Sequence, residues 1–206
     1  MKYLLTIIGF IVVLGLGGML FAWSGIYDIA ATEPHWDVTA SLIGTLRDRS
    51  VAVQSEGVQT PDLDDPQYRM AAVAHYHGMC RLCHGAPGAP INEFAEGLYP
   101  SPPDLTSGAV QNTRSTAEMY WIVKHGIKMT GMPAFGPTHD ETELWGLVAL
   151  ARALPRMSAE AYAKEVERHG EAGGNGHSHA GSGAEEERQE TEEGHSHGED
   201  DNPEHD

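Results

Sequence analysis

The chain contains only two cysteines, and they are separated by two residues in the segment Cys-Arg-Leu-Cys-His. Cys80 and Cys83 are followed directly by His84. Two thiols at this spacing, with an imidazole next to the second, fit three kinds of site: a redox-active dithiol, part of a zinc site, or the attachment point of a c-type haem. The rest of the sequence has to distinguish among these three chemistries.

The sequence argues against the first two kinds of site. A structural zinc site needs four ligands, and the part of the chain expected to be ordered has no second cysteine pair and no pair of histidines at zinc-finger spacing. His75 and His77 are two residues apart on a predicted helix, so their side chains diverge. A thioredoxin-like dithiol needs a βαβ unit, and none is visible. The Cys-x-x-Cys-His pattern meets the requirement for haem in full, because the thiols add to the haem vinyl groups and the histidine binds the iron.

An electron-transfer haem needs a second axial ligand, and two methionines in the segment His125–Gly136 are candidates. Met132 lies between Gly131 and Pro133, and a proline stiffens the backbone that carries the thioether. Met129 lacks these neighbours, so we favour Met132 over Met129. Histidine–methionine ligation closes both axial positions and raises the reduction potential relative to two histidines.

The elements that must position these ligands are predicted to be helical. Residues 66–157 carry the only dense apolar pattern, and no run alternates as a strand would. Because these helices are short and the Gly- and Pro-rich connections long, the segment needs a large apolar group at its centre. The predicted helices are 66–79, 116–125 with a capping box at Ser115 and Glu118, and 140–154 with a capping box at Thr138 and Glu141.

The segments MCRLCHG and TGMPAFG, taken together, resemble the class I monohaem cytochromes c. The resemblance covers about residues 66–157 and implies an all-α fold, in which a small cytochrome c domain surrounds one covalent haem c. It implies that the protein is an electron carrier and not an enzyme. The residues carried over from the family are Cys80 and Cys83 as the covalent attachment, and His84 and Met132 as the axial iron ligands.

The same resemblance implies contacts around the haem. The first and last helices cross at Ala72 and Tyr76. The family commonly has an aromatic residue of the last helix at this crossing; here Leu150 falls at that position, and Trp145 lies about one turn earlier. A proline carbonyl accepts a hydrogen bond from the second ring nitrogen of His84; the candidate residues are Pro87 and Pro90. The loop from Leu98 to Gly108 is expected either to wrap the propionate edge of the haem or to be a rigid surface loop. Trp121, Ile122 and Phe135 are expected to form the pocket wall.

The N-terminal segment is predicted to meet a membrane. Tyr3 to Trp23 is 21 residues without a charge, and at ~1.5 Å per residue such a helix spans roughly 30 Å, the thickness of the hydrocarbon core. Lys2 precedes it and acidic residues follow, so the remainder faces outward. Residues 1–23 are therefore predicted to be a single-pass anchor in a bacterial inner membrane with the haem domain in the periplasm; a cleaved signal peptide is the alternative.

Residues 24–65 are predicted to be a linker with one short amphipathic helix at about 37–53. Its apolar positions, Val38, Leu42, Ile43 and Leu46, recur at helical spacing. We expect this stripe to pack on the following domain; a membrane-surface role with Trp36 at the interface is the alternative.

The C-terminal part of the chain differs in composition. Residues 158–169 are predicted to form a short helix, and residues 170–206, rich in His, Glu and Gly, to be disordered. This tail has twelve acidic residues against Arg188, whereas residues 66–157 are neutral overall. Its repeated Gly-His-Ser-His phrase suggests an accessory site for weak binding of copper, nickel or zinc. The four histidines of that site are His177, His179, His195 and His197.

The leading functional prediction is a membrane-anchored monohaem cytochrome c that passes electrons between respiratory or dehydrogenase partners. The donor would be a quinol-oxidising complex or a dehydrogenase, and the acceptor a terminal oxidase or another cytochrome. No basic stripe suited to nucleic acid is present. The alternatives are a haem-based gas sensor or peroxidase-like protein with a dissociable Met132, and a metal-handling protein that works through the His-rich tail. A further alternative is a fixed subunit of an oxidoreductase complex.

Overall fold

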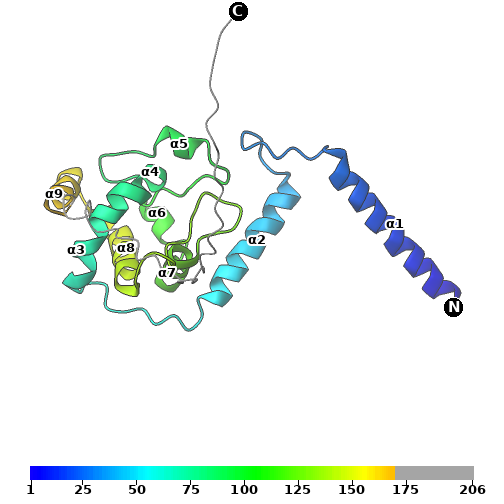
Figure 1. Cartoon of the computed structure of the whole chain (residues 1–206), viewed down its shortest axis with the longest axis horizontal. Helices are drawn as coiled ribbons and strands as arrows, with labels where there is room; N and C mark the ends of the chain where they lie inside the picture. Colours follow the sequence, from blue (N-terminus) through cyan, green and yellow to red (C-terminus); the bar gives the residue numbers. More distant parts are fainter. Residues whose placement is uncertain (170–206) are drawn as a thin grey trace, which may run out of the picture. The chain divides into compact units, whose positions relative to one another are not determined.

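The computed structural model describes residues 1–169, except for the side chains of residues 66, 67 and 69–71. Within this range it contains helices and no β-strand, so the all-α prediction is confirmed (Figure 1). The helices are α1 (Lys2–Ser24), α2 (Asp37–Gln54), α3 (Pro66–His75), α4 (Arg81–His84), α5 (Glu93–Glu96), α6 (Gly108–Gln111), α7 (Thr116–His125), α8 (Glu141–Ala153) and α9 (Ala159–His169), with a π-helical turn at Tyr76–Cys80 and a 3₁₀ turn at Leu154–Arg156.

Helices α3 and α8 pack against each other and form the centre of the domain. Ala72 and Tyr76 share one buried cluster with Leu147 and Leu150, as expected for Leu150 at the crossing. Trp145 instead stacks on Tyr120 of α7, with ring centroids 4.0 Å apart. The crossing thus places α3 beside α8 at the point where the chain enters the Cys-x-x-Cys-His motif.

Gly146 allows this close approach, and no local sequence pattern marks its role. A Cβ atom at position 146 would lie 2.5 Å from the backbone oxygen of Tyr68 and 3.3 Å from the Cβ of Ala72. Real Cβ atoms do not approach a backbone oxygen so closely, so any larger residue forces α3 and α8 apart.

We expect Gly146→Ala to lower the free energy of unfolding by ~1–3 kcal/mol, the usual cost of overpacking a core. Urea unfolding of the full chain in detergent measures this. Gly44→Ala in α2 is the matched control, because nothing lies within 4 Å of a Cβ at Gly44; alanine there is expected to be neutral or stabilising by up to ~1 kcal/mol. Equal effects of the two substitutions would contradict the assigned crossing.

The helix starts follow the capping rules, with one correction. Helix α7 opens with the predicted capping box of Ser115 and Glu118. The predicted box at Thr138 and Glu141 is wrong: α8 is capped by Asp140 and Glu143, while the Thr138 hydroxyl donates to the Phe135 carbonyl. Both pairs have the same spacing, and a turn ending at residue 139 delays the helix by two residues.

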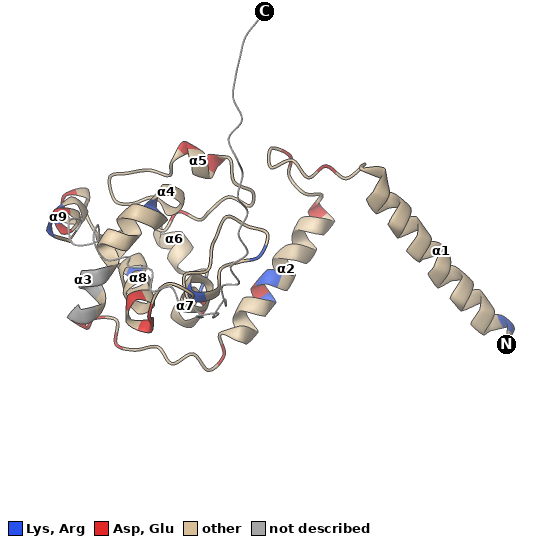
Figure 2. Ribbon diagram, in the orientation of Figure 1, with Lys and Arg blue, Asp and Glu red and all other residues tan. Residues whose placement is uncertain are grey.

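Helix α1 is the one helix of the described chain that is long and apolar enough to cross a membrane, with a mean hydropathy of 2.6. Figure 2 shows no charged residue along it beyond Lys2. Its length, composition and position near the N-terminus fit a membrane anchor and a signal sequence alike.

Helix α2 is present where the sequence predicts a helix, but its predicted packing is wrong. Val38, Leu42 and Leu46 are 73%, 70% and 69% exposed. A different side of α2 faces the domain: Asp48 pairs with Arg114 just before α7, and Val51 is buried. A charged contact and one valine therefore fix the helix, and its apolar stripe faces away.

The short helix after Ser158 is present as α9, and the Ser158 hydroxyl accepts a hydrogen bond from the Ala161 amide. The predicted disordered tail and its metal site at His177, His179, His195 and His197 lie outside the described residues.

Candidate functional site

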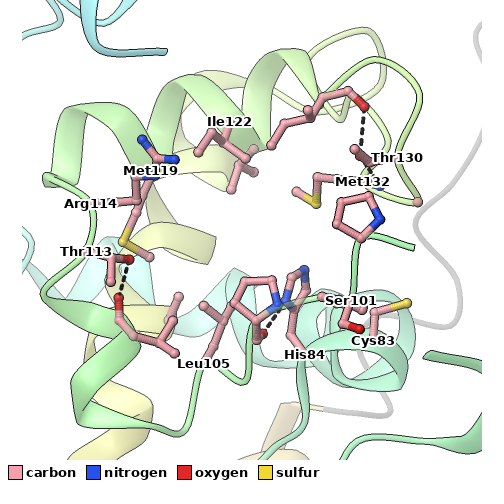
Figure 3. A pocket seen from close by; sticks show the side chains of 18 of the residues that line it. Cys83, His84, Ser101, Leu105, Thr113, Arg114, Met119, Ile122, Thr130 and Met132 are labelled. Carbon is pink, nitrogen blue, oxygen red and sulfur yellow. Dashed lines mark hydrogen bonds between the residues drawn. The ribbon is translucent and has the colours of Figure 1, made fainter. Parts of the chain in front are cut away.

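A cavity of about 350 Å³ lies at the centre of the domain, between α4, α7 and the connecting loops. Most of its wall is apolar, including Leu98, Leu105, Ile122 and Val123. Figure 3 shows His84 and Met132 extending toward the same space from different segments of the chain. The cavity therefore combines an apolar wall with an imidazole and a thioether.

His84 is held in a defined orientation at the end of α4. Its Nδ1 lies 2.8 Å from the Pro103 carbonyl oxygen, to which it donates, and this leaves Nε2 for the cavity. Its own carbonyl accepts a hydrogen bond of 3.0 Å from the Leu105 amide. Burial lowers the pKa of His84, which favours the neutral ring that binds metals.

The proline that fixes His84 corrects the sequence prediction, which named Pro87 and Pro90. Pro87 lies in a tight turn closed by two hydrogen bonds of 2.8 Å between Ala86 and Ala89, so this segment folds on itself. The acceptor comes instead from Pro103, 19 residues after His84. The loop from Leu98 onward thus lines the cavity on the side of His84.

The two cysteines occupy the turn that leads into His84. Cys83 lines the cavity, whereas Cys80 ends the π-helical turn and packs against the core cluster of α3 and α8. Both are free thiols. Burial, together with the nearby Cys83, raises the pKa of Cys80 to about 12. A thiol of this kind is a poor redox nucleophile at neutral pH, because only the thiolate reacts.

The two candidate methionines differ in position. Met132 lines the cavity, whereas Met129 is 99% exposed with a φ of 58°. The Met132 amide donates to the Thr130 hydroxyl at 3.2 Å, and the Met132 carbonyl accepts from the Ile127 amide at 3.1 Å. The geometry therefore favours Met132 as the ligand and leaves Met129 in solvent.

Gly126 holds the methionine loop against the end of α7. Its φ of 66° belongs to the left-handed region, and a Cβ there would lie 2.8 Å from the Met132 carbonyl oxygen. The hydrogen bonds from Phe135 to Val123 and from Gly136 to Lys124, at 3.1 and 2.9 Å, fasten the far side of the loop. The position of Met132 thus depends on a close approach that only glycine permits.

The wall of the cavity contains residues that sequence reasoning missed. Thr113, Arg114 and Met119 line the part farthest from Cys83 in Figure 3, and Arg47 of α2 also lines the cavity. Of the three predicted wall residues, only Ile122 is among the lining side chains; Phe135 is buried in the cluster around Trp145. Arg47 precedes the resembling segment, so no local motif pointed to it.

The donor set fits a haem and not a metal cluster. The described residues hold no group of three or more His, Cys, Asp or Glu side chains arranged to bind a metal ion. One imidazole, one thioether and adjacent thiols around an apolar cavity match what a c-type haem requires.

Comparison with known proteins agrees with this geometry. Residues 69–150 match the family model described as cytochrome c oxidase, cbb3-type, subunit III. The comparisons with curated proteins and with solved structures gave no match. The matched segment contains most of the two crossing helices, the two cysteines, His84 and Met132, and it leaves out α1, α2 and α9.

Proposed function

Because residues 69–150 form a c-type cytochrome domain, which carries covalently bound haem c, we propose that this chain is a membrane-anchored one-electron carrier. Cys80 and Cys83 would form the thioether bonds to the haem, and His84 and Met132 would bind its iron. A haem held in this way supplies a reversible one-electron Fe(III)/Fe(II) couple.

One observation carries the proposal: His84 and Met132, 48 residues apart in sequence, line the same cavity together with Cys83. The pocket fits an electron carrier better than a ligand-activating haem protein, since both axial positions have a protein ligand at hand. Pro103 fixes the ring of His84 and Thr130 fixes the loop of Met132. Ligands fixed in this way would keep the surroundings of the iron similar in both oxidation states.

The electron is proposed to cross at the edge next to the cysteines. Met79 and Leu82 adjoin Cys80 and Cys83 and are 46% and 40% exposed. Apolar side chains around such an edge allow close docking of a partner. Of the two lysines near the methionine loop, Lys124 is engaged with Glu141 and Tyr120, each at 3.3 Å. Lys128 is the exposed one, so it is the better candidate for steering an acidic partner.

The family model, whose name refers to subunit III of a cytochrome c oxidase, supports redox partners of this kind. We propose that the donor is a quinol-oxidising complex or dehydrogenase and the acceptor a terminal oxidase or another cytochrome. Helix α1 is proposed to hold the chain in the inner membrane with the haem domain in the periplasm. The tail histidines remain a proposed accessory site for copper, nickel or zinc.

Carbon monoxide tests the carrier against a gas-sensing or peroxidase-like protein. We expect the reduced full chain in detergent to leave its spectrum unchanged within seconds of adding carbon monoxide, because Met132 occupies the sixth position. Myoglobin, with an open sixth position, serves as the positive control. Prompt and complete formation of a carbonyl complex would instead assign the chain to the ligand-responsive class.

A further inference from the structure

The end of the cavity opposite the cysteines has no assigned role. Haem carries its two vinyl groups at one side of the ring and its two propionate carboxylates at the other. If Cys80 and Cys83 hold the vinyl side, as the proposed function requires, the propionates lie at the opposite end. Figure 3 shows Cys83 at one side of the cavity and Thr113 and Arg114 at the other.

That end of the cavity is lined by two arginines from different parts of the chain. Arg114 precedes α7, and Arg47 comes from α2, outside the family match. Asp48 joins them: its Oδ1 accepts from the Arg47 Nε at 2.8 Å and from the Arg114 Nη2. Hydrogen bonding from Arg47, together with the charge of Arg114, lowers the pKa of Asp48, so its carboxylate stays ionised at neutral pH.

The guanidinium of Arg47 has N–H groups that make no hydrogen bond within the described chain. A guanidinium has five N–H groups, and within the described chain Arg47 uses only its Nε. Arg114 makes more contacts, because its Nη2 pairs with Asp48 and its Nη1 lies 3.6 Å from Oε1 of Glu118. The terminal nitrogens of Arg47 therefore offer the forked geometry that binds a carboxylate through two parallel hydrogen bonds.

Hydrogen bonds to α8 hold the loop around Arg114 in place. Arg152 of α8 donates from Nη2 to the Arg114 carbonyl at 2.7 Å, and Gln111 donates to the carbonyls of Leu105 and Ala151, each at 2.9 Å. Arg152 contributes a further positive charge whose described partners are the carbonyls and the amide oxygen of this loop. Arg47 and Arg114 thus lie beside two carboxylates, Asp48 and Glu118, and Arg152 adds a third positive charge behind the loop. The excess positive charge favours an added anion.

We propose that Arg47 and Arg114, bridged by Asp48, bind the haem propionates, so that α2 forms part of the haem site. This rests on the proposed function, because it requires a haem in the cavity. It explains why α2 contacts the domain through charged side chains while its apolar stripe faces away. The linker helix then adds a cofactor contact that the family segment does not contain.

The test is the midpoint potential of the full-length holoprotein in detergent. A cation at the propionates disfavours the more positive oxidised haem, so Arg47→Gln is expected to lower the potential. At a fixed electrode potential, we expect the ratio of reduced to oxidised haem to fall at least threefold. For a one-electron couple, a tenfold change in this ratio corresponds to about 59 mV. Arg49→Gln is the matched control: it removes the same charge from an exposed position of the same helix.

A second pair of variants is expected to shift the midpoint potential in the opposite direction. Asp48→Asn removes the carboxylate that neutralises both arginines and is expected to raise the potential, and Asp37→Asn, exposed on the same helix, is its control. A purely structural bridge between α2 and the domain would alter the unfolding free energy without these shifts. If Arg47→Gln does not accumulate as a haem protein, the Asp48 pair decides the matter.

The outcomes separate the two proposals. Wild-type protein without haem overturns the proposed function itself. Covalent haem in every variant, with no difference in potential between each variant and its control, overturns the propionate site alone. Opposite shifts for Arg47→Gln and Asp48→Asn, each larger than in its control, establish it.

Discussion

Replacing Met132 by alanine is expected to abolish the long-wavelength absorption band of an iron–thioether bond in the oxidised protein. The potential should fall by on the order of 0.1–0.3 V, within the roughly 0.8 V range that axial ligands set. The physical reason is that the thioether stabilises the reduced iron and the side chain lines the cavity. The reduced variant is also expected to bind carbon monoxide promptly. Optical spectroscopy and a potentiometric titration measure all three changes.

Two other methionines provide controls for this substitution. Met129 is three residues away but 99% exposed, so Met129→Ala should retain both the band and the potential. Met119 lines the cavity far from Cys83 in Figure 3, so Met119→Ala tests the second thioether of the pocket. Loss of the band in either of these variants, with Met132→Ala unchanged, would move the ligand away from Met132.

Replacing both Cys80 and Cys83 by serine should abolish covalent haem and prevent the domain from folding stably. Without the haem, the cavity of about 350 Å³ would be left between α4, α7 and the loops, and short helices alone bury too little apolar surface. We expect no haem-dependent peroxidase stain at the position of the polypeptide on a denaturing gel. We also expect a loss of most of the soluble domain to proteolysis.

Ser101→Ala is the control for the cysteine variant, because Ser101 lines the cavity without an expected bond to haem. It should retain the full stain. Each single cysteine variant should hold the haem through one bond and stain the gel more weakly than the wild type. Staining of the double variant at wild-type intensity would show that the cysteines do not carry the cofactor.

The candidate site residues that the sequence indicates are those marked by local chemistry. Cys80, Cys83 and His84 form a contiguous motif, and Pro133 marks the methionine loop. The boundaries of α7 also followed from local signals, since Ser115 and Glu118 cap its start and Gly126 ends it. In each case the determining residues lie within a few positions of one another.

Features that depend on the path of the chain were missed or mispredicted. The proline carbonyl next to His84 belongs to Pro103 and not to Pro87 or Pro90, because the direction of the loop decides which carbonyl reaches the ring. Gly146 was overlooked, since its importance comes from the backbone oxygen of Tyr68 on another helix. No spacing rule links residues 78 positions apart.

Helix α2 shows how a correct helix prediction can carry a wrong packing prediction. The apolar spacing of Val38, Leu42 and Leu46 indicated the helix, but not the side that faces the domain. That side is fixed by the contact between Asp48 and Arg114, which an amphipathic pattern does not report.

The most direct test of the central claim is extraction of the purified full-length protein with acidified acetone, followed by a pyridine haemochrome assay of both fractions. We predict one haem per chain, all of it in the precipitated polypeptide, with the spectrum of a haem whose two vinyl groups are saturated. Colourless protein, or haem released into the acetone, would contradict the account.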